Sequence, residues 1–590
     1  MSCRDECMSM DTLAQHRLVC NVLVIGTGAA GIRAALAADQ AGCDVVLVGK
    51  RARSDPHTVL AAGGINAALG TVDPEDSWEQ HYIDTMHEGY GLGDPSAVML
   101  LAKESPAAVR ELEAWGCPFA RTFDGKLDQR YFGAHRYRRT CYAGDYTGRA
   151  IVRTLVARLQ RTHVTVVEQM YIAELLVQRG RCFGAVGFDL STGEKTVFCA
   201  DAVVLAGGGH TRIWRRSSSR RDENTGDAMA LAFRAGCSLG DMELVQFHPT
   251  GMVAPEEWAG TLVTEAVRGE GGHLTNALGE RFMERYDPRR MELSTRDRVA
   301  LANYSEILAG RGGPNGGVFL DISRLPKDVI IEKLPRMYRQ FLEAQMLDIS
   351  RSPMEVAPTA HYSMGGVVVT AETHATELTG LFAAGEATCG VHGANRLGGN
   401  SLAETLVFGR RAGEAAALLS TQTDAQLRDR AAIQDALDRL SGVVKRGSEM
   451  ARPLQRAIRD LMWEHCGVVR SQASIEAGLT KLASVASVVD RVGVQPSSEG
   501  YQDLAVALDL RGSIIAAEAS LRSALERRES RGAHQRTDHP DSLSARLNTR
   551  VIPTDDGGME IRSVPVPVGS AELPDWESAE DLQLVGRLLE

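Results

Sequence analysis

Val22-Leu23-Val24-Ile25-Gly26-Thr27-Gly28-Ala29-Ala30-Gly31 decides the fold of this chain. The four apolar residues at its start predict a buried strand, and the residues that follow Gly31 are rich in strong helix formers. The glycines have the spacing of the dinucleotide fingerprint: Gly26 permits a tight turn, Gly28 lets the backbone approach a pyrophosphate, and Gly31 lets helix and strand pack closely. The free N–H groups of the helix start then attract the phosphates.

A second apolar run, Val45-Val46-Leu47-Val48, lies where the second strand of a βαβ unit is expected. Strand, glycines, helix and strand in this order are more specific than the glycine spacing alone. The acidic ribose ligand expected about 20 residues after the glycines is replaced by Gly49-Lys50. The fingerprint therefore predicts a bound dinucleotide but leaves FAD and a nicotinamide nucleotide both open.

Length, charge and cysteine pattern narrow the class of protein. The chain has 590 residues, enough for two or more domains, and a formal net charge of −11 that argues against a nucleic acid partner. We find no apolar run long enough to span a membrane, and the polar lead-in Met1–Arg17 lacks the apolar core of a signal peptide. Eleven cysteines without a C-x-x-C pair predict no metal or iron–sulfur site and indicate reduced thiols in the cytoplasm.

The rest of the chain divides by pattern. Strand-like runs that end in glycines recur at 201–209 and 379–386, and the βα rhythm is lost between them, at about 246–352, which predicts an inserted domain. Apolar residues recur at helical spacing from about 421 to 531 and predict a helical bundle.

Two local expectations concern a proline and a run of charges. Pro106 is expected near the start of a helix that runs to Trp115. Arg136, Arg138 and Arg139 are expected on a solvated face, which is the usual location of such a run.

Six motifs connect these stretches: H-T-V-x-A-x-G-G-I, H-P-T-G, T-E-x-x-R-G-E-G-G, R-D, H-Y-x-M-G-G and G-A-N-R-L-G-G-N-S-L. Together they resemble the flavoprotein subunit of succinate dehydrogenase and fumarate reductase, a family that includes L-aspartate oxidase. The resemblance runs from about Val22 to His534 and implies an α/β fold: a Rossmann-like FAD-binding domain with an inserted α+β capping domain and a C-terminal helical bundle. The implied boundaries are 18–245 and 353–420 for the FAD-binding domain, 246–352 for the capping domain, 421–540 for the helical domain, and 541–590 for a divergent tail with an amphipathic end.

The resemblance implies that the dinucleotide is FAD. His57 matches the histidine that this family bonds to the flavin 8α-methyl, whereas the residue alone would suggest an ordinary loop histidine. Pro56 and Ala62 depart from the family's usual sequence here. The implied flavin contacts are Gly26, Gly28, Ala29, Ala30, Gly31, Lys50, His57, Thr58, Ala62, Gly63, Gly64, Asp227, Glu386, Ser401 and Leu402.

The resemblance also implies a C4 dicarboxylate site. An arginine presents a forked, charged donor set to a carboxylate, and histidine and threonine add directional donors. The implied substrate residues are His248, Thr264, His361 and Arg396, with Phe132 packed beside the substrate.

By the same resemblance, Arg296 is the proton-transfer residue, with Glu265 and Arg268 in its relay. A free arginine has a pKa above about 12, so this role needs neighbouring cations that ease loss of the proton. A structural salt bridge is the commoner role of an arginine.

The implied reaction moves a hydride between the C2–C3 bond of succinate or fumarate and the flavin, while Arg296 moves the proton. The implied partners are membrane anchor subunits and an iron–sulfur subunit, with quinone as acceptor, at the inner face of the cytoplasmic membrane. Two alternatives stay open: L-aspartate oxidase with non-covalent FAD, against which His57 and Met364 argue, and a non-catalytic flavin-binding assembly subunit, which predicts missing catalytic groups. The physiological direction stays open.

Overall fold

The computed structural model describes residues 15–495, 500–570 and 572–577. Most of the lead-in and the amphipathic end of the tail lie outside these residues.

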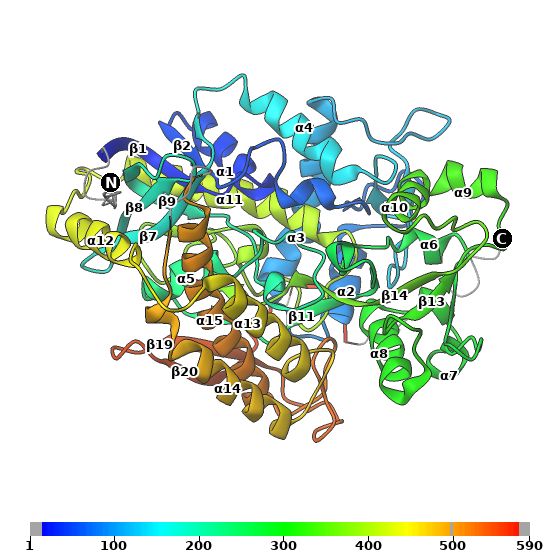
Figure 1. Ribbon diagram of the computed structural model, residues 1–590. Coiled ribbons are helices and arrows are strands. Elements are labelled where there is room, and N and C mark those ends of the chain that lie inside the picture. The colour runs from blue at the N-terminus through cyan, green and yellow to red at the C-terminus, as the bar shows by residue number, and fades with distance from the viewer. Residues whose placement is uncertain (1–14, 496–499, 571, 578–590) are drawn as a thin grey trace, which may run out of the picture.

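A seven-stranded sheet forms the centre of the described part of the chain (Figure 1). Strand β1 lies between β2 and β9 and runs parallel to both. Val22 and Val24 pack into the hydrophobic cluster on one face, Leu23 and Ile25 into that on the other, because successive side chains of a strand point to opposite faces. The strands in order across the sheet are β6 Thr165–Val167, β2 Val45–Val48, β1 Gln15–Ile25, β9 Lys195–Leu205, β8 Arg181–Asp189 and β7 Met170–Gln178, with β16 Leu381–Ala383 also beside β9.

The turn after β1 requires glycine at two positions. Gly26 has φ 122°, and a Cβ there would lie 2.1 Å from Ala206 O. A Cβ at Gly31 would lie 1.7 Å from Gly26 O, so only glycine lets the next helix start this close to the strand. Several helices cover the face of the sheet where Val22 and Val24 lie, and their apolar residues belong to the same hydrophobic cluster. They are α1 Ala29–Gln40, α3 Pro95–Ala114, α4 Thr147–Leu159 and α11 Asn400–Thr421.

The expectation for Pro106 is wrong, because Pro106 lies in the interior of α3. Helix α3 starts after Asp94, whose side chain accepts hydrogen bonds from the N–H groups of Ser96 and Ala97. A proline inside a helix removes one backbone hydrogen bond. Burial of Leu101 and other residues of this helix in the core outweighs that loss, since packing provides most helical stability in proteins.

The expectation for the arginine run is wrong at Arg139. Its side chain is fully buried, and Nη2 lies 2.8 Å from both Asp76 and Asp84. Arg138 pairs with Asp73 at 2.5 Å. These carboxylates lie far upstream in the sequence, so the run itself gives no sign of its partners.

The inserted segment forms its own antiparallel sheet and hydrophobic cluster, at the right of Figure 1. The first and last strands of the insertion, β11 and β14, are neighbours in this sheet. The sheet therefore extends to Ser363, beyond the boundary expected at residue 352. The elements are β11 Val245–Met252, α6 Ala266–Gly269, β12 His273–Thr275, α7 Met283–Tyr286, α8 Arg296–Glu306, β13 Val318–Asp321, α9 Lys327–Lys333, α10 Pro335–Gln345 and β14 Met354–Ser363.

Four helices follow the second part of the Rossmann-like domain, and the arrangement confirms the predicted fold class. They share the hydrophobic cluster on the other face of the central sheet. None of the helices in the described ranges is both long and apolar enough to cross a bilayer. The four are α12 Arg430–Val443, α13 Ala451–His465, α14 Gln472–Ala486 and α15 Gln502–Glu526.

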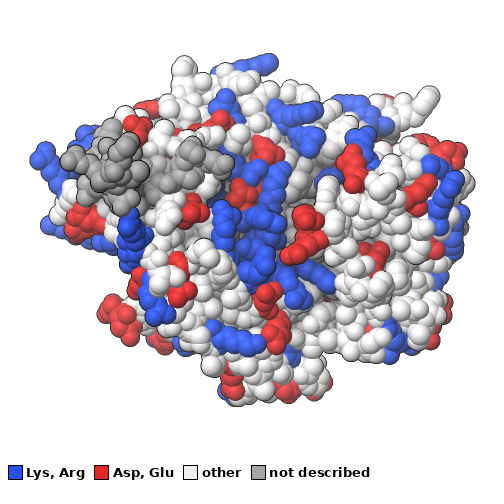
Figure 2. All heavy atoms as spheres, viewed as in Figure 1, with Lys and Arg blue, Asp and Glu red and all other residues white. Residues whose placement is uncertain are grey.

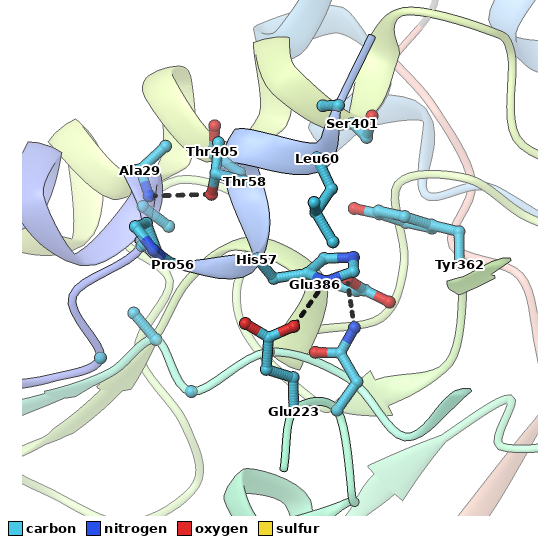
Figure 3. Close-up of a pocket in the computed structure, with 18 of the residues that line it drawn as sticks. Ala29, Pro56, His57, Thr58, Leu60, Glu223, Tyr362, Glu386, Ser401 and Thr405 are labelled. Carbon is cyan, nitrogen blue, oxygen red and sulfur yellow. Dashed lines mark hydrogen bonds and ion pairs between the residues drawn. The ribbon is translucent and has the colours of Figure 1, made fainter. Parts of the chain in front are cut away.

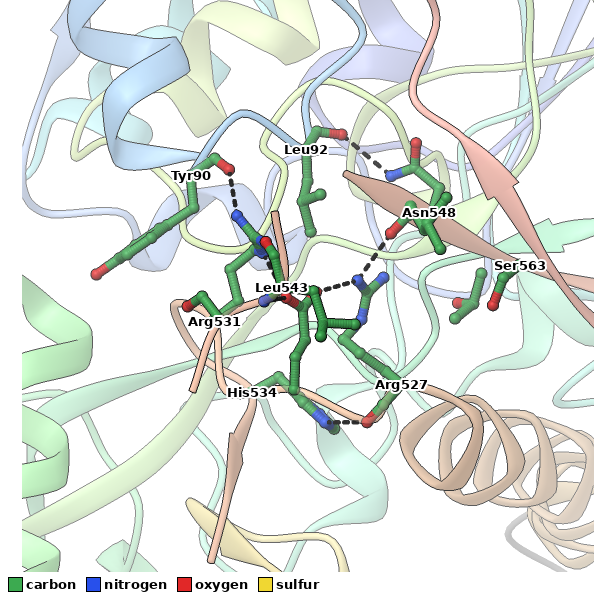
Figure 4. Close-up of polar contacts among 12 residues, drawn as sticks. Tyr90, Leu92, Arg527, Arg531, His534, Leu543, Asn548 and Ser563 are labelled. Atoms are coloured by element: carbon green, nitrogen blue, oxygen red, sulfur yellow. Dashed lines mark hydrogen bonds and ion pairs between the residues drawn. The ribbon is translucent and has the colours of Figure 1, made fainter. Parts of the chain in front are cut away.

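The described part of the tail is a hairpin built into the fold. Strand β19 Leu547–Pro553 pairs with β20 Met559–Pro565 and with β10 Leu239–Gly240, and β10 also pairs with β15 Gly366–Val367. Beside this hairpin, Asn548 Nδ2 donates to Leu92 O at 3.1 Å (Figure 4). The tail therefore joins the Rossmann-like part of the molecule.

Arg527 lies at the centre of this junction (Figure 4). Its side chain is 3% exposed and lies 3.2 Å from Asp241, 2.6 Å from Glu243 and 3.1 Å from Glu529. Arg527 thus compensates the carboxylates of Asp241 and Glu243, and it shares Glu529 with Arg531, which lies 2.8 Å from that carboxylate.

Arg527→Ala should lower the free energy of unfolding by roughly 3–5 kcal/mol, because it leaves buried carboxylates without their cation. Denaturant unfolding measures the loss. The matched control is Arg562→Ala on β20, where the arginine is exposed and pairs with the exposed Glu560, so stability should change little. Equal losses in both variants would contradict the central role of Arg527.

Candidate active site

A long cavity begins at the glycine turn after β1 and extends beneath the inserted segment. It is lined by every residue predicted to contact cofactor or substrate except Gly31, which packs against the turn. The relay residue Arg268 also lies outside the lining, behind Glu265. The predicted residues that line the cavity are Gly26, Gly28, Ala29, Ala30, Lys50, His57, Thr58, Ala62, Gly63, Gly64, Phe132, Asp227, His248, Thr264, Glu265, Arg296, His361, Glu386, Arg396, Ser401 and Leu402.

Two helix N-termini open into this cavity. Helix α1 starts after Gly28 without a capping side chain, and Thr58 Oγ1 accepts a hydrogen bond from Ala29 N at 3.3 Å. Helix α11 starts after Gly399, also without a capping side chain, and its residue Ser401 lines the cavity. The first N–H groups of a helix carry partial positive charge, so both ends suit phosphate or other electron-rich groups.

Lys50 occupies the place of the usual acidic ribose ligand, and carboxylates from other segments surround it. Its Nζ lies 2.8 Å from Asp227 Oδ2 and 3.7 Å from Asp509 Oδ1. Asp227 Oδ1 is buried and has no hydrogen-bond partner among the described residues, as expected of an acceptor for a ligand hydroxyl. The helix start at the glycine turn and this free oxygen together fit a dinucleotide. Asp509 belongs to α15, and no motif around it predicts its place here.

His57 starts the short helix η2 His57–Leu60 (Figure 3). Its Nδ1 lies 3.1 Å from Glu223 Oε2. Burial acts to lower the pKa of His57, but the hydrogen bond to Glu223 and the charge of that residue outweigh it, so the pKa is raised. Sequence reasoning missed Glu223, because it lies in a loop outside every motif.

Glu386 lies behind His57 (Figure 3). It accepts hydrogen bonds from Ser363 N at 3.0 Å and from Asn224 Nδ2 at 3.4 Å. Burial raises the pKa of Glu386 to about 7, although the charge of His57 opposes the rise. This carboxyl group can therefore change charge near neutral pH.

At the other end of the cavity, Gln246 joins two arginines. Its Oε1 accepts from Arg296 Nη1 at 3.1 Å and from Arg396 Nη2 at 2.9 Å. Gln246 precedes His248 by two positions on β11, so both lie on one face of that strand. This alternation was the sequence signal that could have identified Gln246.

Glu265 connects Arg296 to Arg268. Its Oε2 accepts from Arg296 Nε at 2.9 Å and lies 3.8 Å from Arg268 Nη2. Burial acts to raise the pKa of Glu265, but the charges of Arg296 and Arg268 outweigh it and lower the pKa to about 2. The three residues predicted as a relay are therefore contiguous.

His248 and His361 face each other with ring centroids 5.3 Å apart. Burial, followed by nearby positively charged groups, lowers the pKa of both rings well below the usual value, so both are neutral at physiological pH. His248 Nδ1 accepts from Thr250 N at 3.2 Å, and His361 Nδ1 lies 2.9 Å from Ser218 Oγ. With Nδ1 as acceptor, each Nε2 carries a hydrogen that can be donated to a ligand.

Arg396 is a buried cation without a carboxylate partner in the described ranges. Its guanidinium lies 4.4 Å from the ring centroid of Tyr362, whose hydroxyl donates to Glu404. Burial and then the charge of Arg296 lower the pKa of Arg396 to about 10, so it remains charged at neutral pH. An unpaired buried charge is costly, and an anionic ligand would remove that cost.

Comparisons with known proteins point to flavoproteins. A family profile described as "FAD binding domain" matches residues 21–402, and one described as "Fumarate reductase flavoprotein C-term" matches residues 455–571. The chain is 45% identical to a subunit of the "Fumarate reductase (CoM/CoB)" of Methanothermobacter marburgensis, over 89% of this chain and 95% of that protein. It resembles the solved Mycobacterium smegmatis Sdh1 in complex with UQ1, with 40% identity, a TM-score of 0.84, and coverage of 94% of this chain and 95% of that one. It also resembles the solved E. coli quinol fumarate reductase, with 33% identity, a TM-score of 0.89, and coverage of 95% of this chain and 99% of that one.

Asp227→Ala should weaken FAD binding, because a hydrogen bond to a charged group contributes about 1.5–3 kcal/mol, which is roughly 10- to 150-fold in Kd. The measurement is a fluorescence titration of FAD-free protein in a His57→Ser background, where no covalent bond can retain the flavin. Asp222→Ala, an exposed acid paired with Arg51, is the control. If Asp227→Ala bound FAD as tightly as the parent His57→Ser protein, Asp227 would be excluded from the FAD site.

Proposed function

Because the chain belongs to the family of succinate dehydrogenase and fumarate reductase flavoprotein subunits, we propose that it interconverts succinate and fumarate with FAD. The observation that carries this proposal is the buried, unpaired Arg396 beside Arg296. Two guanidinium groups and two neutral histidines line one end of the cavity. A small dicarboxylate supplies the negative charge that this end of the cavity lacks.

Arg396 would hold one substrate carboxylate, because its Nε has no partner among the described residues. His248, His361 and Thr264 would donate to the carboxylate oxygens from their places in the cavity lining. Gln246 would fix Arg396 relative to Arg296, since it accepts from both. This arrangement orients the C2–C3 bond relative to the proton-transfer residue.

When bound, FAD supplies a hydride acceptor and donor. Arg296 would move the proton at the carbon next to the one that exchanges the hydride. Glu265 would return a proton to Arg296 or remove one from it, through their hydrogen bond at 2.9 Å. Arg268 lies fully buried behind Glu265 and continues the relay away from the substrate.

Phe132 would shield this chemistry from water. Its ring lies so close to Gly63 and Gly398 that a Cβ on Gly63 would meet it at 2.6 Å. A dry site strengthens the electrostatic interactions inside it. Phe132 would therefore strengthen the attraction between the arginines and a bound carboxylate.

Electrons would leave the flavin through an iron–sulfur partner subunit, with quinone as the final acceptor. The similarity to the Sdh1 complex with UQ1 and to quinol fumarate reductase supports this part of the proposal. Membrane anchor subunits would then hold the assembly at the inner face of the cytoplasmic membrane. The relative named for CoM and CoB supplies the competing outcome, in which CoM and CoB take the place of quinone.

FAD would be bonded to His57, which lines the cavity next to the glycine turn. L-aspartate oxidase is not favoured, since two of the relatives compared above are named as fumarate reductases. A non-catalytic assembly subunit would lack catalytic groups, whereas Arg296, Glu265 and Arg396 lie together here.

The test of this function is the substrate and acceptor dependence of the purified protein. Succinate should reduce the flavin, and an artificial dye or a quinone should accept its electrons. L-aspartate should reduce it little. Rapid reduction by L-aspartate with dioxygen as acceptor would overturn the proposal.

Arg396→Lys should raise the succinate KM at least tenfold, because lysine loses the forked donor set while keeping the charge. Steady-state kinetics measures the change. Arg411→Lys is the control: this arginine lies elsewhere on α11 and pairs with Glu104. An unchanged KM and turnover would remove Arg396 from the substrate site.

Arg296→Ala should keep FAD and bind dicarboxylate while turnover falls by about 10²–10⁴-fold, the usual contribution of a general acid–base group. Ligand-induced changes of the flavin spectrum report binding, and kcat reports the loss. Arg298→Ala changes an exposed arginine on the same helix and should leave kcat nearly unchanged. Activity of Arg296→Ala within a few-fold of wild type would assign the proton to another residue.

A further inference from the structure

We propose that Glu223 is a positioning residue that holds His57 in the one tautomer able to bond the flavin. The inference rests on the proposed covalent attachment of FAD at His57, and it gives Glu223 a role in forming that bond. Glu223 itself would touch neither the flavin nor the substrate.

The carboxylate of Glu223 is fixed on both sides, and Figure 3 shows the side that contacts His57. One oxygen lies 3.1 Å from His57 Nδ1. The other lies 3.3 Å from Arg220 Nη1 and 3.4 Å from Arg51 Nε. The Glu223 side chain is only 6% exposed, so its orientation is set by these contacts and not by solvent.

Both arginines also hold the backbone segment that leads to His57. Arg51 and Arg220 pair with Asp55, two residues before His57, at 2.6 and 2.9 Å. Arg51 and Arg220 therefore fix the backbone before His57 through Asp55, and they fix the ring of His57 through Glu223. A loop histidine without a structural or chemical role does not need this arrangement.

A carboxylate can only accept a hydrogen bond, so it selects the ring form with hydrogen on Nδ1. Burial acts to raise the pKa of Glu223, but the hydrogen bond and charge of His57, with the arginines, outweigh it and lower the pKa. Glu223 is therefore ionised at neutral pH. The neutral ring of His57 then carries its lone pair on Nε2, which is the nitrogen left to form a bond.

The bond-forming step balances without an external oxidant. His57 Nε2 bonds to the 8α carbon, and that carbon loses one hydrogen. The ring loses its Nδ1 hydrogen, which Glu223 can accept. The flavin takes up the hydrogen of the broken C–H bond together with its electron pair and is left as the reduced anion, while Glu223 holds the proton from the ring. Fumarate then takes a hydride from the flavin and one proton, becomes succinate and leaves the flavin oxidised.

The charged and titratable groups that face His57 come from three segments. They are Glu223 and Arg220 in the loop, Glu386 in η7 Gly385–Ala387, and His361 on β14. Because the pKa of His57 is raised, the ring is protonated and has no lone pair at acidic pH. Attachment should therefore become faster as pH rises through that raised pKa.

The experiment incubates the full-length, FAD-free protein with FAD and fumarate at a series of pH values. Flavin fluorescence of the acid-denatured chain on a gel, and the mass of the chain, measure attachment over time. FAD content before acid treatment measures binding. Glu223→Gln is compared with Glu223→Asp, with Asp124→Asn as a control at an exposed acid that pairs with Lys126 and His57→Ser as the reference without attachment.

Glu223→Gln should bind FAD normally but attach it at least tenfold more slowly at the pH where wild type is fastest, because an amide both donates and accepts and no longer selects the tautomer. The midpoint of its pH profile should move to lower pH. Glu223→Asp should recover part of the rate, and Asp124→Asn should match wild type.

Attachment in Glu223→Gln at the wild-type rate and with the wild-type pH profile would overturn this inference and leave the proposed function intact. Loss of FAD binding in Glu223→Gln would also overturn it, because Glu223 would then hold the cofactor. A wild-type chain that carries no covalent flavin would overturn both the attachment proposal and this inference.

Discussion

The antiparallel pairing of β11 with β14 determines where the active-site groups lie. The insertion leaves the Rossmann-like domain on one of these strands and returns on the other. The pairing brings the rings of His248 and His361 together in an edge-to-face arrangement, although more than a hundred residues separate them in the sequence. Arg296, at the start of α8, then reaches Gln246 on the same sheet. A change of register would move these side chains to the opposite face of the sheet.

The positive charge of the arginines in the cavity is only partly balanced by carboxylates of the protein. Arg296 and Arg396 share a neutral glutamine instead of a carboxylate. Gln246 satisfies one donor of each guanidinium and neutralises neither. The positive charge therefore remains available to a ligand, and the protein accepts an electrostatic cost in the free state that binding removes. Glu265 balances part of the charge from the side of the relay.

The sequence predicts the parts of this site that depend on backbone shape and on contiguous motifs. The turn at Gly26 and Gly31 is one example, since no other residue fits the contacts there. Contacts between distant segments are not encoded in a local pattern, which is why Arg139 with Asp76, Glu223 with His57 and Asp509 with Lys50 were not foreseen. Pro106 shows the related limit that tertiary packing outweighs a local preference.

The carboxylates around Lys50 have a consequence for synthesis of the protein. The glycine turn and Lys50 leave the ribosome early, but Asp509 on α15 is made only after most of the chain. The hairpin that pairs with β10 follows later still. A chain that ends before α15 thus presents the glycine turn and Lys50 without Asp509, the second carboxylate beside the lysine. The charge around Lys50 is therefore balanced by both carboxylates only after α15 has been made.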